Sequence, residues 1–535
     1  MKRIVSLFLS LSLIVSSVAC TFSDWFGLTS TQIPPTPIGP TPTPMPAASV
    51  TFNVTLPAPI LPDETLYLSI VDEVTGLGLN PKNYPMQALD ATHYTLTLPF
   101  PLGSVVTYRY LRQAVLPIFE DDAYDQPVRY RMYYVQAPGI VQDVVTSWSD
   151  MRFTGATGRV SGKVVSAVDG KPIPGILIAV GGQQTLTDST GYFLIDGLLP
   201  GIHNLVAFAP DGAYQTFQQG AMVAEGKNTP AEFSLQPSQF VSVTFLVHAP
   251  PDTVQNAPIR LAGNLITLGN TFANLHAGFS TMASRMPTLT PVGGGRYSLT
   301  LSLPAGIDIR YKYTLGDGYW NAEHAPDGSF VLRQLILPAG QSTFAVQEYI
   351  STWQDGPSSP ILFEVETPPE TPVSDMISIQ FNPYGWAEPI PMWPLGNGKW
   401  MYRLYSPFRS LSTFQYRYCR NDQCGIADDI ETAPPHYGRT VTPSLTPQNL
   451  KTIISAWKWL QPNQPNAVVG LPVTPRASDF WAGVEFLPAS DPSWQPWMPQ
   501  AILTLKSLYN ELVSRFALLD SQDNPRLPVC TYPRL

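Results

Sequence analysis

Residues 94–112 read YTLTLPFPLGSVVTYRYLR, and this stretch decides the fold. Apolar and polar residues alternate on both sides of a Pro/Gly corner, which is the pattern of two half-buried β-strands joined by a turn. The pattern returns at residues 297–315 (YSLTLSLPAGIDIRYKYTL) and 401–420 (MYRLYSPFRSLSTFQYRYCR). The sequence therefore predicts three β-hairpins or meanders of the same kind.

Each of these stretches belongs to a longer repeat. VTFNV at residues 50–54, VTFLV at 243–247 and ILFEV at 361–365 open the repeats, and a strand that ends in tryptophan closes each one. The central tyrosine precedes the closing tryptophan by 40, 42 and 41 positions, in the pairs Tyr108 and Trp148, Tyr311 and Trp353, and Tyr416 and Trp457. This spacing predicts three immunoglobulin-like β-sandwiches of about 100 residues, with the closing tryptophans in structural positions.

The composition agrees with an all-β chain. Proline accounts for 56 of 535 residues, and it interrupts helices but is tolerated at strand edges and turns. The net charge of -9 argues against nucleic acid as a partner, because phosphate binding needs a basic face. Cysteines and histidines form no metal-site pattern, and we expect a monomer without metal or cofactor. The predicted fold class is all-β, with tandem immunoglobulin-like sandwiches and a short α/β fragment at the C-terminus.

The N-terminus has the pattern of an export signal. Lys2 and Arg3 precede an apolar run at residues 4–15, which is too short for a convincing membrane span. The run is followed by SVAC, which resembles a bacterial lipoprotein signal, where the cysteine (here Cys20) is acylated and becomes the new N-terminus. Ser17 stands where that family usually has leucine. The alternative is an ordinary cleaved signal with an incidental cysteine.

A Pro/Thr-rich linker at residues 21–48 follows this signal peptide of residues 1–20. Its Pro/Thr repeats, at about residues 29–48, favour the extended polyproline II conformation, which would hold the first folded module about 60 Å from the membrane. Signal and linker together predict an exported protein that is lipid-anchored at the bacterial cell surface.

The three repeats, at residues 49–151, 239–356 and 359–460, resemble the family 20 starch-binding module. That family has a VTF-type opening strand, a loop with glycine and asparagine, and a YKY strand followed by a sugar-facing tryptophan. The middle copy is the most similar, with AGN at 262–264, LGN at 268–270, YKY at 311–313 and YWN at 319–321. The resemblance implies a polysaccharide partner, α-glucan above all. The residues expected to contact it are Lys312, Tyr319, Trp320, Asn321 and Glu323.

All three copies depart from the family's sugar-binding residues. In the middle copy, Thr271 and Phe272 stand at the second platform position. The first copy has Arg109 for the lysine and Phe119 near the platform position, and the last copy has Arg417 for the lysine and Gly425-Ile426 where the ring is expected, with Trp386 among aromatic residues elsewhere. Aromatic rings in such positions stack on the apolar face of a pyranose. The alternative is that these rings pack in the core or between domains.

Residues 155–237 have a different signature, with DG at 169–170, TDSTGYF at 187–193 and LLPG at 198–201. These motifs resemble the carboxypeptidase regulatory-like (transthyretin-like) domain, a small β-sandwich. The resemblance implies a spacer or folding aid without catalytic residues. DG and TG are hairpin turns, because they place glycine where positive φ is needed.

Catalysis is not predicted within the residues given. No nucleophile elbow, phosphate loop or dinucleotide fingerprint occurs, and no carboxylate pair of a glycosidase can be identified. Residues 475–535 resemble the opening βα unit of a barrel glycosidase, although a whole barrel needs about 250 residues. Cys419 and Cys424 flank a hairpin tip, where an exported protein can form a local disulfide.

The predicted function is therefore carbohydrate binding, of the starch or α-glucan type, by a non-catalytic lipoprotein at the cell surface. Two alternatives stay open. One is a truncated surface glycoside hydrolase whose barrel is missing. The other is an adhesion or scaffold protein without a sugar site.

Replacing Cys20 by serine tests the predicted lipid anchoring. The hydroxyl cannot take the thioether-linked lipid, so we expect the variant to be unprocessed or released from the membrane. Detergent-phase partition and mass spectrometry of the mature N-terminus measure the outcome. The lipoprotein signal would be contradicted if the variant were processed like the unaltered protein and the mature N-terminus of the unaltered protein carried no lipid.

Overall fold

The computed structural model describes residues 46–71, 74, 81–113, 116–270, 282–382, 386, 389–405, 413–421, 423–424, 427 and 438–457. The chain divides into two compact units, with the boundary between Asp355 and Gly356. In these described parts, no helix has the length and hydropathy of a membrane span. The predicted signal peptide with Cys20, most of the linker, and the fragment at residues 475–535 lie outside the described residues.

The first sandwich covers residues 47–148. Its strands are β1 (Ala47–Thr55), β2 (Thr65–Ile70), β3 (Lys82–Pro85), β4 (Gln87–Ala88), β5 (His93–Pro101), β6 (Val105–Gln113), β7 (Pro117–Asp121), β8 (Arg131–Tyr134), β9 (Gly139–Val144) and β10 (Ser147–Trp148). One sheet has the order β4-β5-β1-β9, and the other has the order β10-β7-β6-β2-β3 with β8 also paired to β6. The opening strand β1 lies antiparallel to β5 and parallel to β9.

The third sandwich, at residues 240–353, repeats this topology. Its elements are β19 (Phe240–His248), β20 (Arg260–Gly263), the 3-10 helices η1 (Ile266–Leu268) and η2 (Ala283–Arg285), β21 (Thr290–Gly293), β22 (Arg296–Pro304), β23 (Asp308–Thr314), β24 (Arg333–Ile336) and β25 (Thr343–Tyr349). The sheets have the orders β21-β22-β19-β25 and β20-β23-β24. The opening strand β19 again pairs antiparallel with the hairpin strand β22 and parallel with β25.

The fourth sandwich, at residues 361–457, has the same plan. Its strands are β26 (Ile361–Glu366), β27 (Ile377–Asn382), β28 (Ile390–Pro391), β29 (Trp393–Gly396), β30 (Lys399–Leu404), β31 (Phe414–Arg420), β32 (Gln423–Cys424), β33 (Arg439–Val441) and β34 (Gln448–Ile453). The sheets have the orders β29-β30-β26-β34 and β28-β27-β31-β32, with β33 paired to β31. A disulfide joins Cys419 to Cys424, which are register partners in the β31–β32 hairpin.

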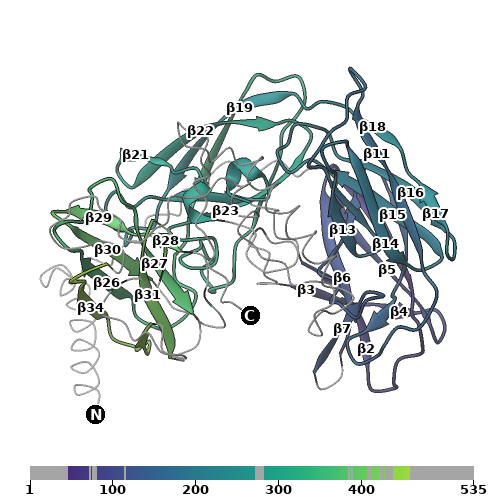
Figure 1. Cartoon of the computed structure of the whole chain (residues 1–535), viewed down its shortest axis with the longest axis horizontal. Helices are drawn as coiled ribbons and strands as arrows, with labels where there is room; N and C mark the ends of the chain where they lie inside the picture. Colours follow the sequence, from purple (N-terminus) through teal and green to yellow (C-terminus); the bar gives the residue numbers. More distant parts are fainter. Residues whose placement is uncertain are drawn as a thin grey trace, which may run out of the picture. The chain divides into compact units, whose positions relative to one another are not determined.

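The second sandwich, at residues 158–235, lies between the first two copies of the repeat along the chain. Its strands are β11 (Gly158–Ser166), β12 (Leu177–Val180), β13 (Gln183–Leu186), β14 (Tyr192–Leu198), β15 (Gly201–Phe208), β16 (Phe217–Val223), β17 (Asn228–Pro230) and β18 (Phe233–Leu235). One sheet is β14-β11-β17 with β18 also paired to β11, and the other is β13-β12-β15-β16. Figure 1 shows the strands of this sandwich in blue to teal.

The cores follow from the alternation in the sequence. In β1, Val50, Phe52 and Val54 are buried, while Thr51 faces outward and shares a hydrogen bond with Thr97 at 2.8 Å. Side chains on a strand point alternately to opposite faces, so the period-2 pattern fixes which residues form the core. The closing tryptophans Trp148, Trp353 and Trp457 are each 1% exposed, which confirms their structural role. The predicted class of tandem β-sandwiches is also confirmed.

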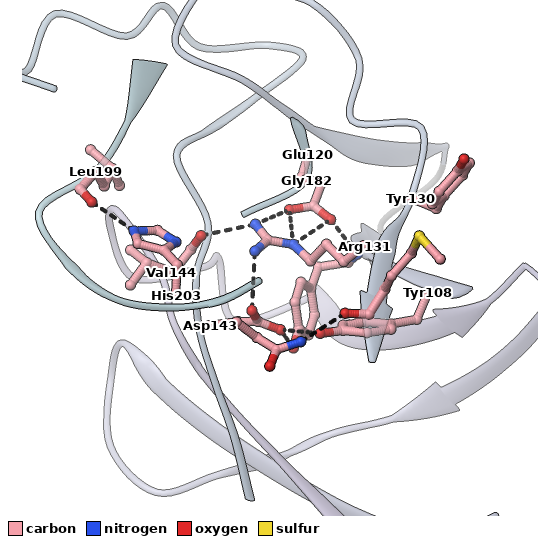
Figure 2. Close-up of polar contacts among 12 residues, drawn as sticks. Tyr108, Glu120, Tyr130, Arg131, Asp143, Val144, Gly182, Leu199 and His203 are labelled. Atoms are coloured by element: carbon pink, nitrogen blue, oxygen red, sulfur yellow. Dashed lines mark hydrogen bonds and ion pairs between the residues drawn. The ribbon is translucent and has the colours of Figure 1, made fainter. Parts of the chain in front are cut away.

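A buried charge network joins the two sheets of the first sandwich (Figure 2). Arg131 on β8 pairs with Glu120 on β7 at 2.8 Å and with Asp143 on β9 at 3.2 Å. The hydroxyls of Tyr108 and Tyr110 both donate to Asp143, each at 2.8 Å, and Glu120 also accepts the Tyr110 N–H at 2.9 Å. Since β9 belongs to one sheet and β6, β7 and β8 to the other, these contacts cross the sandwich.

The third sandwich contains the same network. Arg333 pairs with Glu323 at 2.6 Å and with Glu348 at 3.2 Å. Tyr311 and Tyr313 donate their hydroxyl protons to Glu348 at 3.0 and 2.6 Å, and Glu323 accepts the Tyr313 N–H at 2.9 Å. The repeat thus conserves a three-dimensional arrangement as well as a strand pattern.

In the fourth sandwich the carboxylate on the last strand is replaced. Thr452 occupies the position of Asp143 and Glu348, because it pairs with Val365 on the opening strand as they pair with Val54 and Val247. The Tyr418 hydroxyl lies 3.4 Å from the Thr452 hydroxyl, and the Arg439 guanidinium lies 5.0 Å from the centre of the Tyr418 ring. A neutral side chain therefore replaces the charged acceptor of the other two copies.

Replacing Arg131 by methionine tests the importance of the network. The change leaves Glu120 and Asp143 buried without their cation, so the first sandwich should lose about 3 to 5 kcal/mol of unfolding free energy. The urea dependence of hydrogen exchange in β1 and β5 measures this loss. The control is Lys171→Met, which breaks an exposed ion pair with Asp169 and should cause no measurable change. Equal stability of the two variants would contradict a structural role for the network.

Candidate functional site

The third sandwich brings the residues predicted to contact sugar into one region. Lys312 lies on β23, and the other predicted residues follow in the turn after this strand. The Phe330 ring is stacked with that of Tyr319 at 6.2 Å between centroids, and its centroid lies 5.3 Å from Lys312 Nζ. Sequence reasoning missed Phe330, because it belongs to none of the motifs that mark the repeat.

Two polar side chains shape the turn after β23. The Thr314 hydroxyl oxygen accepts the Gly316 N–H at 2.9 Å. Asp317 Oδ1 accepts the N–H groups of Tyr319 at 3.0 Å and Trp320 at 2.8 Å. Short polar side chains that bond to backbone groups a few residues ahead stabilise tight turns. These bonds therefore fix the positions of the two aromatic residues.

Most of the predicted contact residues are enclosed by protein. Lys312 is 0% exposed, Trp320 2% and Asn321 4%, whereas Tyr319 is half-buried. A ring that stacks on a sugar has to present a face, and Trp320 presents none in this arrangement. Thr271 and Phe272, at the second platform position, lie outside the described residues. Sugar contact by Lys312, Tyr319, Trp320 and Asn321 stays a prediction.

Glu323 is different, because the structure gives it another role. Its carboxylate is 1% exposed, pairs with Arg333 and accepts the Tyr313 N–H. Glu120 makes the corresponding contacts in the first sandwich. Glu323 therefore belongs to the buried charge network, and sugar contact by this residue stays a prediction.

Asp317 is a buried acid of this turn with a raised pKa. Burial raises its pKa to about 6, although hydrogen bonds from the Trp320 and Tyr319 N–H groups and the charge of Lys312 oppose the shift. Removal of water disfavours the carboxylate more than these contacts favour it. The turn is thus less stable when Asp317 is ionised.

In all three copies of the repeat, a lysine or arginine stands between two core tyrosines on one strand. An aromatic ring lies near the cationic side chain in each copy. The pairs and their distances from side-chain cation to ring centroid are Arg109 and Phe119 at 4.3 Å, Lys312 and Phe330 at 5.3 Å, and Arg417 and Trp386 at 3.9 Å. The two flanking tyrosines point into the core, so alternation places the cation on the outer face of its sheet. The ring comes from a different segment in each copy.

In the fourth sandwich the ring of this pair is a tryptophan. Trp386 and Arg417 are both half-buried. Arg417 Nε donates to Gln380 Oε1 at 2.7 Å, and Asn382 Nδ2 donates to Gln415 Oε1 at 3.2 Å on the neighbouring register pair. An aromatic ring beside amide and guanidinium groups is the chemistry that sugar-binding faces use.

Two acidic residues of the first sandwich, Glu120 and Asp122, make structural contacts. Glu120 belongs to the charge network. Asp122 Oδ1 accepts the N–H groups of Tyr124 and Gln126 at 2.7 and 2.9 Å, and its Oδ2 accepts a hydrogen bond from Gln183 at 2.6 Å. Among the residues that the structure describes, no three His, Cys, Asp or Glu side chains form a group that could hold a metal ion.

Comparison with known families places one segment of the chain. Residues 159–236 match the carboxypeptidase regulatory-like domain. The second sandwich is thus a regulatory-like domain, as its motifs predicted. A curated relative, an alpha-amylase of Niallia circulans, is 33% identical over 116 residues, which are 21% of this chain and 8% of the relative. The chain therefore spans a small part of the length of that relative.

Two solved structures show fold likeness at low identity. The glucoamylase of Hormoconis resinae is 21% identical, with a TM-score of 0.15, over 21% of this chain and 18% of the glucoamylase. A streptococcal ancillary pilin is 10% identical, with a TM-score of 0.20, over 56% of this chain and 99% of the pilin. Both TM-scores are under 0.5, so neither likeness indicates what this chain does.

The pKa of Asp317 predicts a pH dependence of stability. The folded pKa of about 6 lies above the ordinary value of 3.8, so the folded state holds the proton more tightly. Stability should fall by up to about 3 kcal/mol as the pH rises from 4 to 7. Asp317→Asn should remove this part of the slope, measured as the urea dependence of hydrogen exchange in the third sandwich. The control is Asp327→Asn, an exposed residue of the same sandwich, and an equal effect of both changes would contradict the assignment.

Proposed function

We propose that this protein binds polysaccharide of the α-glucan class at the bacterial cell surface, without catalysing a reaction in the residues present. The observation that carries the proposal is the half-buried Trp386 ring over Arg417 on the outer face of the fourth sandwich. Arg417 holds one side of the ring at 3.9 Å, and a sugar can contact the part that Arg417 leaves open. The platform of the α-glucan site is thus Trp386.

The polar groups around this ring suit a hydroxyl-rich ligand. Gln380 and Asn382 lie on β27, opposite Arg417 and Gln415 on β31, so four hydrogen-bonding side chains share one face. Because these groups bond to one another, their orientations are set before a ligand arrives, and less conformational entropy is lost on binding. The similarity of a 116-residue stretch to an alpha-amylase supports a carbohydrate ligand.

The third sandwich is the second candidate for the site. It keeps the lysine and tryptophan of the starch-binding module, but both side chains are enclosed. Binding there would require the turn after β23 to move and expose Trp320. This cost makes the third sandwich the weaker binder of the two.

Adhesion or scaffolding without a sugar site is the alternative from another functional class. Its support is the structural use of side chains that a binding module would expose, in particular the enclosure of Lys312 and Trp320. Failure of the unaltered protein to bind any glucan would favour this function.

Trp386→Ala tests the platform. The change removes the ring that contacts the sugar, so affinity for soluble starch should fall by about 1 to 3 kcal/mol, or roughly 5- to 150-fold in Kd. Affinity electrophoresis of the whole chain measures the difference. The control is Tyr192→Ala, which removes an aromatic side chain 39% exposed on the regulatory-like domain and should leave retention unchanged.

Two outcomes contradict parts of this proposal. Equal retention of Trp386→Ala and the unaltered protein removes Trp386 as the platform. If Trp320→Ala instead abolishes retention while circular dichroism shows an intact fold, the site lies in the third sandwich.

A further inference from the structure

The outer face of the sheet β13-β12-β15-β16 in the regulatory-like domain contacts the first sandwich through amide side chains. Asn204 Nδ2 donates to the Met132 carbonyl at 3.0 Å, and Gln218 Oε1 accepts the Tyr134 N–H at 2.7 Å. Met132 and Tyr134 lie on β8, whose other edge pairs with β6. The two amides thus bond to the backbone edge that β6 leaves open, where another strand could otherwise pair.

Further contacts join the same two sandwiches. Gln184 donates to the Tyr130 carbonyl, and the Tyr124 hydroxyl donates to Asp196. Gly182 has a φ of +90°, and a Cβ at this position would lie 2.8 Å from a methyl group of Val128. Glycine is therefore needed here for both its conformation and the close approach. The regulatory-like domain therefore lies in close contact with the first sandwich, and the polar groups named above are hydrogen-bonded across the contact.

The regulatory-like domain also contacts the third sandwich. Gln215 Nε2 donates to the Ala305 carbonyl at 2.9 Å, and the Pro210 carbonyl accepts the Ile266 N–H at 2.8 Å. A Cβ on Gly212 would lie 2.6 Å from the Pro304 ring. Again an amide side chain and a glycine make the contact.

The first and third sandwiches touch directly as well, although the regulatory-like domain separates them in the sequence. Asp308 accepts the Val105 N–H at 2.8 Å. The Nε2 group of Gln334 donates two hydrogen bonds, one to Ser104 Oγ at 2.9 Å and one to Asp308 Oδ1 at 2.8 Å. Each of the three sandwiches therefore contacts the other two.

We propose that the regulatory-like domain is an intramolecular clamp, which binds the free edge of β8 and the β22–β23 end of the third sandwich and makes the first three sandwiches one cooperative unit. A spacer would need only its two covalent connections. Four amides of the clamp, Gln184, Asn204, Gln215 and Gln218, are neutral and bond to backbone groups, so these four contacts depend little on salt or pH. The direct contact at Asp308 also joins the first sandwich to the third.

Hydrogen exchange at increasing urea tests the clamp in the whole chain, with mass spectrometry reporting on peptides from each sandwich. In the unaltered protein, the first three sandwiches should lose protection at one common urea concentration. In the double variant Asn204→Ala, Gln218→Ala, the first sandwich should separate from the other two, and the Tyr134 amide should exchange on the order of ten times faster in the absence of urea.

Two controls make the result specific. Gln347→Ala removes an exposed amide that bonds to Tyr349 within the third sandwich, and it should leave the three transitions coincident. Asp308→Asn keeps the shape of the direct contact and weakens it, so it should separate the first and third sandwiches less than the double variant does. Separate transitions in the unaltered protein, or coincident transitions and unchanged Tyr134 exchange in the double variant, would overturn the proposal.

Discussion

The contact that joins the two sheets of the first and third sandwiches is a buried guanidinium held between two carboxylates. Arg131 pairs with Glu120 from its own sheet and with Asp143 from the opposite sheet, and Arg333 does the same with Glu323 and Glu348. A hydrophobic interface between sheets tolerates sliding, because apolar contact has no direction. Ion pairs and tyrosine hydroxyls have fixed geometry, so they specify how one sheet lies over the other.

The outer face follows from this buried network. Tyr108 and Tyr110 are fixed by their hydrogen bonds to Asp143, and the residue between them has to point to the opposite side of the sheet. That residue is Arg109 in the first copy, Lys312 in the third sandwich and Arg417 in the fourth. The position of this cation is therefore set by the core. The ring beside it comes from loops, which is why the three copies differ in ring and exposure.

Sequence reasoning predicted what has a period or a fixed spacing. Alternation gave the opening strands and the buried Val50, Phe52 and Val54, and the distance from tyrosine to tryptophan predicted the closing residue of each copy. It could not predict the network, because Arg131 and Arg333 occur in stretches without a common motif. Nor could it place Glu323 in this network, because Glu323 lies in the loop of Trp320, three positions later, and a sequence does not show which face a loop residue takes.

The difference between the third and fourth sandwiches now has a physical basis. In the third, Asp317 and Thr314 fix a turn that encloses Trp320, and the turn retains a buried acid whose pKa is raised to about 6. A buried acid of this kind is costly at neutral pH, so the turn is held by packing and backbone hydrogen bonds against its own electrostatics. In the fourth, Trp386 rests on Arg417 at the surface and needs no such acid. The third sandwich, whose motifs resemble a starch-binding module most, is thus the copy whose ring is enclosed, because Thr314 and Asp317 fix the turn that carries the ring.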